Sequence, residues 1–187
     1  MNSDGDTDIV CSARPRAGTT ASGPVGPDCD AFRAALDSPN VYVLPEGDLR
    51  GCDLRGLSVT AFDFSKTNFS GADLRGVKLK RSTLVEANFS EADLEGANLS
   101  ESAAFLANFD LANLSHANLR SSDFAEVQFR RSLLIGANLE RARDFDPVDV
   151  NGPIYGDTIC PDGSNSFDED GDDGTCQLNE GSPPSDF

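Results

Sequence analysis

Leucine and phenylalanine recur at every fifth position through the middle of the chain. Between Leu49 and Leu139 every fifth residue is Leu or Phe, except Val59 and Ala104. A small residue usually stands two positions earlier and an Asp or Asn usually lies between the two, as in residues 72–74 (Ala-Asp-Leu). A period of five matches neither the 3.6-residue period of an α-helix nor the two-residue period of a strand. It is typical of a solenoid in which each repeat forms one side of a coil.

Residues twenty apart resemble one another more than neighbouring repeats do. One such column is mainly aromatic: Leu49, Phe69, Phe89, Phe109 and Phe129. The next is entirely leucine: Leu54, Leu74, Leu94, Leu114 and Leu134. Stacked aromatic rings and uniform aliphatic packing would produce these columns if four repeats completed one coil. The pattern therefore predicts an all-β solenoid with four sides per coil.

The repeat Ala-Asp/Asn-Leu-x-x resembles the pattern of the pentapeptide-repeat family. That resemblance implies a right-handed quadrilateral β-helix in which the Leu/Phe and the small residue two before it point inward. Residues 47–143 would form about five coils of this β-helix. Leu57, Phe62 and Val77 depart from the pattern, because each replaces the small inward residue.

The segments on either side of the repeats are expected to close the ends of the rod. Residues 1–27 read as a flexible polar leader, and residues 28–46 as a short helical cap followed by an entry strand. Asp28 can cap the helix, and Phe32 and Leu36 would form its apolar face. Residues 144–187 carry twelve acids and no base, and are expected to form an acidic C-terminal cap or tail.

The tail resembles a Cys-bracketed segment that follows the repeats in a subset of bacterial pentapeptide-repeat proteins. The matching stretches are residues 158–166 (Thr-Ile-Cys-Pro-Asp-Gly-Ser-Asn-Ser) and 174–176 (Gly-Thr-Cys). The resemblance implies a compact loop closed by a disulfide between Cys160 and Cys176. Closing a loop of about sixteen residues contributes about 3 kcal/mol in the chain-entropy model.

The five cysteines bear on the cellular compartment. Cys52 occupies an inward small-residue position and is expected to be a buried free thiol. Local pairing of the other four gives Cys11–Cys29 and Cys160–Cys176, although four cysteines allow three pairings. Two disulfides would indicate an oxidising compartment, extracellular or periplasmic. No signal peptide is visible, so either a leader has been removed or the protein is intracellular with reduced thiols. The cysteine pattern favours the exported protein.

An acidic run in the tail raises a calcium hypothesis. Asp168, Asp170 and Asp172 alternate along it, and hard cations prefer several such oxygen ligands. The spacing is not that of an EF-hand, so any ion would be structural. The alternative is a solvated acidic loop without a metal.

The charge distribution argues against nucleic-acid mimicry. The chain has a net charge of −17, but residues 47–143 hold thirteen acidic and twelve basic residues. A DNA-mimicking, gyrase-binding protein needs negative charge along the rod at phosphate-like density. Such a protein is therefore the second choice, and direct nucleic-acid binding is not expected because no aromatic residues interleave the outward bases.

Apolar residues interrupt the outward positions on one side of the rod. Val85, Phe105 and Ala125 stack there, and Leu106 adjoins them, so the group is a candidate interaction patch. One alternative is that the tail residues cover it: Ile154, Tyr155, Ile159 and Phe167. The other is that Phe105 turns inward to fill the space left by Ala104.

No catalytic constellation is visible in the sequence. It offers no nucleophile–base pair and no glycine-rich phosphate loop, and no apolar stretch is long enough to span a membrane. The sequence predicts a non-enzymatic structural or protein-interaction module, with a protein partner or a second copy of the chain as its ligand. A calcium-stabilised surface protein is a further alternative.

Overall fold

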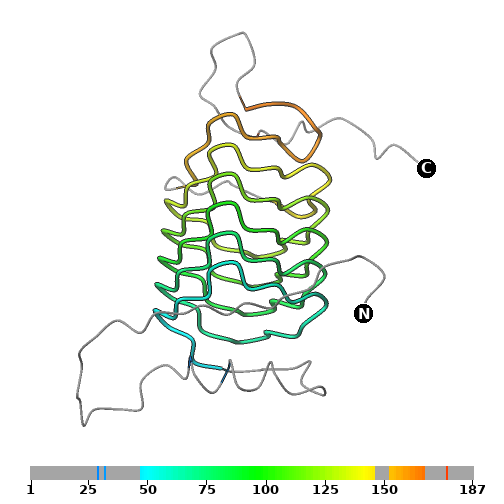
Figure 1. The fold of residues 1–187 in the computed structure, drawn as a ribbon. Coiled ribbons are helices and arrows are strands. Elements are labelled where there is room, and N and C mark those ends of the chain that lie inside the picture. Colours follow the sequence, from blue (N-terminus) through cyan, green and yellow to red (C-terminus); the bar gives the residue numbers. More distant parts are fainter. Residues whose placement is uncertain (1–28, 30–31, 33–46, 146–151, 167–175, 177–187) are drawn as a thin grey trace.

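The chain winds into a rod of stacked four-sided coils (Figure 1). The computed structural model describes residues 29, 32, 47–145, 152–166 and 176. Parallel β-bridges join residues twenty apart, from Asp48↔Asn68 at one end of the repeats to Asp123↔Arg143 at the other. Within the described repeats each side contributes one bridging residue, the position just before the central Leu or Phe. The predicted four-sided solenoid is therefore confirmed.

Backbone hydrogen bonds between successive coils run along the rod. The Leu74 amide donates to the Asp93 carbonyl at 2.7 Å, and the Asp93 amide donates back to the Ala72 carbonyl at 2.9 Å. The same exchange recurs in repeat after repeat. Buried backbone groups need such partners, and the short bridges provide them without long strands.

Each corner of the coil is a tight turn with one residue in the left-handed region. At the corner after Leu74, the Val77 amide donates to the Leu74 carbonyl at 3.0 Å, and Gly76 has a φ of 64°. A positive φ at the third residue is what a type II turn requires. Glu91 holds a φ of 59° although it is not glycine, so stacking enforces the turn where the residue does not favour it.

The outward Asn and Asp side chains support these turns. The Asn88 Oδ1 accepts a hydrogen bond from the Ser90 amide at 3.0 Å, and the Asn138 Oδ1 accepts one from the Glu140 amide at 2.9 Å. The bond is an Asx turn, which offers the backbone a local partner at the corner. The Asp/Asn position of the repeat is therefore structural.

The inward columns form one continuous core. Phe69, Phe89 and Phe109 stack with ring centroids 4.8 Å apart at each step and planes tilted by only 6° and 4°. Leu74, Leu94 and their equivalents in the leucine column are fully buried. The predicted aromatic and leucine ladders are therefore confirmed.

An aromatic side chain covers each end of this core. Phe32 is 2% exposed, and its ring centroid lies 6.0 Å from that of Phe64 in the first coil. At the far end Phe145 is also 2% exposed, with its centroid 5.3 Å from that of Phe129. Cys29 and Phe32 have helical backbone, but the rest of segment 28–46 lies outside the described residues. The helical cap stays a prediction.

The tail begins by extending the solenoid. Leu133 bridges Ile154 and Asn138 bridges Ile159, so the spacing is twenty-one residues instead of twenty. Tyr155 comes directly after the bridging residue Ile154, just as Leu134 comes directly after Leu133 in the coil below. In the same way, Cys160 takes the position that Leu139 has in the coil below. The inserted residue hid this stacking from a search for an uninterrupted period of five.

The Phe ladder predicts a large and local cost for truncation. Phe89→Ala removes a ring packed on both faces, and we expect it to lower the free energy of unfolding by about 3–5 kcal/mol. Phe105→Ala is the matched control, because Phe105 is 39% exposed, and it should cost less than about 1 kcal/mol. Urea denaturation followed by circular dichroism measures both, and equal losses would contradict the stacked core.

Candidate interaction surface

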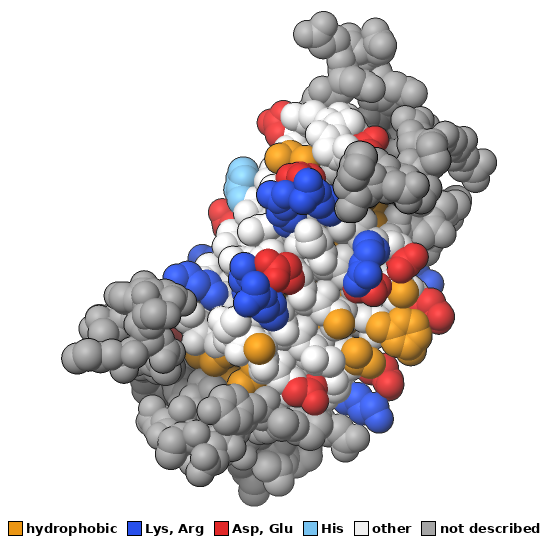
Figure 2. All heavy atoms as spheres, turned by 90° about the vertical axis from the view of Figure 1, so that its right-hand side faces the viewer, with side chains coloured by type: hydrophobic (Ala, Val, Ile, Leu, Met, Phe, Trp, Pro, Cys, Tyr) orange, Lys and Arg blue, Asp and Glu red, His pale blue; other side chains and the backbone are white. Residues whose placement is uncertain are grey.

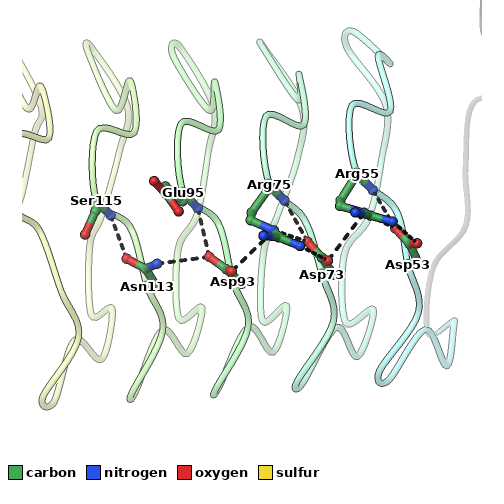
Figure 3. Close-up of polar contacts among 8 residues, drawn as sticks. All are labelled: Asp53, Arg55, Asp73, Arg75, Asp93, Glu95, Asn113 and Ser115. Carbon is green, nitrogen blue, oxygen red and sulfur yellow. Dashed lines mark hydrogen bonds and ion pairs between the residues drawn. The ribbon is translucent and has the colours of Figure 1, made fainter.

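One face of the rod carries a ladder of alternating carboxylates and guanidinium groups (Figure 3). Arg55 Nη2 lies 2.7 Å from Asp53 Oδ2, and its Nε lies 3.4 Å from Asp73 Oδ2 in the next coil. Arg75 repeats the arrangement, 2.6 Å from Asp73 and 3.5 Å from Asp93. Each arginine thus bridges two stacked aspartates that would otherwise repel one another.

The ladder favours the ionised form of Asp73. The hydrogen bond from Arg75 lowers the pKa of Asp73 below its usual value. Further along, the Asn113 Nδ2 donates to Asp93 Oδ1 at 3.0 Å, so an amide takes over the role of the arginine. A paired, ionised carboxylate of this kind cannot supply a proton near neutral pH, which agrees with a structural role at the turn.

The same face becomes apolar toward the C-terminal end. Leu133 takes the column position of the aspartates, Ile154 bridges to it, and Ile135 follows two residues later. Ile135 is 39% exposed and Ile154 is 53% exposed. This group was not predicted from the sequence, although the change from Asp and Asn to Leu in one column was a usable signal.

The predicted patch of apolar side chains is on the surface. Phe105 is 39% exposed and Leu106 is 40% exposed, whereas Val85 and Ala125 are partly buried beside them. Ala103, also exposed, extends the group and was not predicted. Figure 2 shows hydrophobic side chains gathered at one edge of a face, with acidic and basic side chains around them. We call these five residues the corner patch.

One alternative explanation of the corner patch is wrong, and the described residues give no support to the other. Phe105 does not fill the space beside Ala104, since Ala104 is itself fully buried and Phe105 points to solvent. The tail does not fold over the patch through Ile154 or Ile159, because these pair with Leu133 and Asn138 on other sides of the coil. Phe167 lies outside the described residues.

The disulfide prediction was half right. Cys160 and Cys176 are bonded, as the tail resemblance implied. Cys29, however, is bonded to Cys52, so the expected Cys11–Cys29 pair and the free Cys52 thiol were wrong. Nearness in sequence favoured Cys11, which lies outside the described residues, whereas the fold brings Cys29 to the first coil.

The Cys29–Cys52 bond has a clear structural setting. Cys52 is 1% exposed in its inward position, and Phe32, three residues after Cys29, packs on Phe64 of the same coil. The disulfide therefore ties Cys29, close in sequence to the Phe32 side chain that packs on this end of the core, to the first coil. The other disulfide uses Cys160, likewise buried at 3% exposure, at the far end.

The proposed calcium ligands Asp168, Asp170 and Asp172 lie outside the described residues. Within the part of the chain that is described, no three His, Cys, Asp or Glu side chains are grouped so that they could hold a metal ion. The described residues also contain no helix with the length and apolar character needed to cross a bilayer.

Comparison with known families identifies the architecture. The profile described as pentapeptide repeats matches eight copies, over residues 48–81, 63–100 and 112–143. The chain belongs to the pentapeptide-repeat family. The resemblance seen in its sequence is therefore confirmed, and so is the quadrilateral β-helix that the resemblance implied.

Several solved structures of this family are similar to the chain. A pentapeptide-repeat protein from the thylakoid lumen of Arabidopsis thaliana is 30% identical, with 55% of this chain and 69% of that one covered and a TM-score of 0.34. Rfr23 from the cyanobacterium Cyanothece 51142 is 25% identical, with 68% and 95% covered and a TM-score of 0.38. QnrB1, a plasmid-mediated fluoroquinolone resistance protein, is 17% identical, with 65% and 74% covered and a TM-score of 0.43. No curated protein sequence matches significantly.

The disulfide assignment predicts a distinct pattern of thiol reactivity. In Cys29→Ala, Cys52 becomes a thiol that alkylates only after denaturation, and the free energy of unfolding falls by about 2–4 kcal/mol. Peptide mapping after alkylation without reductant locates the label, and urea denaturation measures the loss. Cys11→Ala is the control and should change neither quantity; release of a reactive Cys29 by that substitution would contradict the assignment.

The ladder predicts a pH-dependent contribution to stability. The pKa of Asp73 is lowered in the folded protein, so the stabilisation from Arg75 is complete above the unfolded pKa of 3.8 and disappears as the pH falls through the lower folded value. Because the pair is exposed to solvent, which screens it, we expect Arg75→Gln to lower the free energy of unfolding only slightly at pH 7. Urea denaturation at pH 7 and pH 2 should show that the difference from the unsubstituted protein vanishes in acid. An undiminished difference at pH 2 would mean that Arg75 acts by packing alone.

Proposed function

We propose that the chain is a non-enzymatic protein-interaction module that acts outside the cytoplasm. Its architecture would be a right-handed β-helix of about five coils, closed by a short helical N-terminal cap and by the disulfide-bonded tail. The ligand would be a protein, either another protein or a second copy of this chain, held against a rigid side of the rod.

The corner patch is the observation that carries this proposal. Contiguous exposed apolar side chains are unusual on a soluble surface and mark contact sites. The side chains stand on a backbone that is already fixed, since the Glu86 amide donates to the Phe105 carbonyl at 2.9 Å and the Leu106 amide to the Ala125 carbonyl at 3.0 Å. A surface ordered before binding loses little conformational entropy when a partner docks.

The two disulfides support the location. Cys29–Cys52 and Cys160–Cys176 both join an inward position of the rod to a flanking segment. Structural disulfides persist in oxidising compartments and are rare where thiols are kept reduced. We therefore place the protein in the extracellular space or the periplasm.

Neutralised carboxylates make DNA mimicry the weaker choice. The acidic column that could imitate phosphates is interrupted by Arg55 and Arg75, each within 3.5 Å of aspartates in two coils. A nucleic-acid-like face needs successive negative charges that remain uncompensated. A gyrase-binding role like that of a DNA mimic therefore receives no support from this face.

A crosslinking experiment tests the interaction surface. A photo-reactive phenylalanine analogue at position 105 should capture one defined protein, or a second copy of the chain, when the protein is illuminated in its native compartment. Adding Leu106→Gly should lower the capture at least about fivefold, because it removes apolar area. It keeps the turn, since Leu106 has a φ of 58°, which glycine adopts readily.

Leu111 provides the matched control. It is 50% exposed and has a φ of 61°, but it lies at the next corner. The same photo-reactive group at position 111 should give little capture. Equal capture from both positions, or none from position 105, would refute the corner patch as the contact surface.

A further inference from the structure

A polar pocket opens at a different corner of the rod, away from the corner patch. It has a volume of about 420 Å³. Three cations, Lys80, Arg120 and Arg141, stand around it together with one carboxylate, that of Glu101. Ser100 and Ser121, also in its wall, are small residues in two neighbouring corner columns. The members of these columns in the adjacent coils, such as Lys80, Arg120 and Arg141, are long and charged, which explains the hollow.

Positive charge exceeds negative charge at this corner. Glu101 is shared by Lys80, at 2.9 Å, and Arg81, at 2.7 Å. Glu140 is shared in the same way by Arg120, at 3.0 Å, and Arg141, at 3.5 Å. Each carboxylate thus serves two cations, which leaves two positive charges in excess on a protein whose net charge is −17.

Hydrogen-bond donors complete the wall of the pocket. The Asn118 Oδ1 accepts from the Arg120 amide at 3.2 Å, so the other end of this side-chain amide, its NH₂ group, is the end that can donate. The hydroxyl groups of Ser100 and Ser121 add further donors. Ser100 is 6% exposed and its amide is held by Asn98 Oδ1 at 3.1 Å, so this part of the wall is fixed in advance.

We propose that this pocket binds an oxyanion, a phosphate or sulfate group, through Lys80, Arg120 and Arg141. Guanidinium groups match the geometry of tetrahedral oxyanions, and the serine and asparagine donors supply the remaining hydrogen bonds. The volume exceeds that of the anion alone, so there is room for a small hydrophilic carrier such as a sugar. The polar wall makes an apolar ligand unfavourable.

Titration of the full-length protein with sodium phosphate and, separately, sodium sulfate tests the site. Sodium chloride holds the ionic strength constant, and amide NMR spectra report where each anion binds. We expect saturable shifts confined to the amides around Ser100, Asn118 and Ser121. Arg120→Gln and Arg141→Gln should each weaken binding about tenfold, because each removes a charge-assisted pair of hydrogen bonds.

Arg50→Gln is the matched control. Arg50 is also an exposed arginine, paired with Asp48 at 2.7 Å, but it lies at another corner in the first coil. This substitution should leave anion affinity unchanged. Equal weakening by all three variants, shifts spread along the arginines of the ladder, or the same shifts with sodium chloride alone would overturn the proposal.

A second titration separates a free anion from one carried by a sugar. A sulfated disaccharide prepared from heparin should produce shifts at the same amides if the pocket takes carbohydrate-borne sulfate, and it should bind more tightly than inorganic sulfate. Tighter binding of inorganic phosphate than of the disaccharide would identify a site for the free ion. Both results depend on Arg120 if the proposal is correct.

Discussion

The hydrogen bonds that join one coil to the next impose the twenty-residue register on which every other feature depends. Each bridging residue exchanges backbone bonds with the coils above and below, so the backbone at one height is a copy of the backbone at the next. Side chains in a column therefore share one environment. An inward column must be filled at every level, as the Phe69–Phe89–Phe109 stack and the buried leucines show. The left-handed residue at each corner follows from the same constraint, because the turn must recur wherever the coil bends.

Stacking has a different consequence on the outside of the rod, where identical charges would lie directly above one another. The chain resolves this by placing a counter-charge between them. Arg55 and Arg75 each reach aspartates in two coils. Glu101 and Glu140 each pair with a cation of the preceding coil, Lys80 and Arg120 respectively. Because the columns are so regular, a position where the residue type changes indicates a candidate functional site. The corner patch is a break in which apolar side chains replace polar ones, and the corner pocket is a break in which serines replace long charged residues.

A solenoid leaves its first and last coils with unpaired edges, which invite association with other chains. Here each end receives an aromatic side chain, Phe32 or Phe145, over the core. Each end also has a disulfide that starts from an inward position, Cys52 or Cys160. Covalent attachment at these positions fastens the flanking chain where the periodic packing stops. Different interactions therefore stabilise the two parts. Repeated backbone hydrogen bonds between coils hold the middle of the rod, and aromatic packing and disulfides act at its two ends.

The sequence by itself determined the repeating part of the fold. Each repeat packs mainly on copies of itself, so the five-residue period is visible directly in the order of residues. The inward Leu and Phe columns and the outward position of Phe105 both followed from that period. The tertiary structure alone decided which cysteine joins Cys29, since the pairing depends on where a non-repeating segment meets the first coil. The tertiary structure also revealed that residues 152–161 continue the stack of coils. A one-residue insertion interrupts the five-residue period there, so the sequence pattern is lost although the hydrogen bonds between coils continue. The corner pocket, too, required three dimensions, because its cations come from repeats twenty and forty residues apart and become neighbours only when the coils stack.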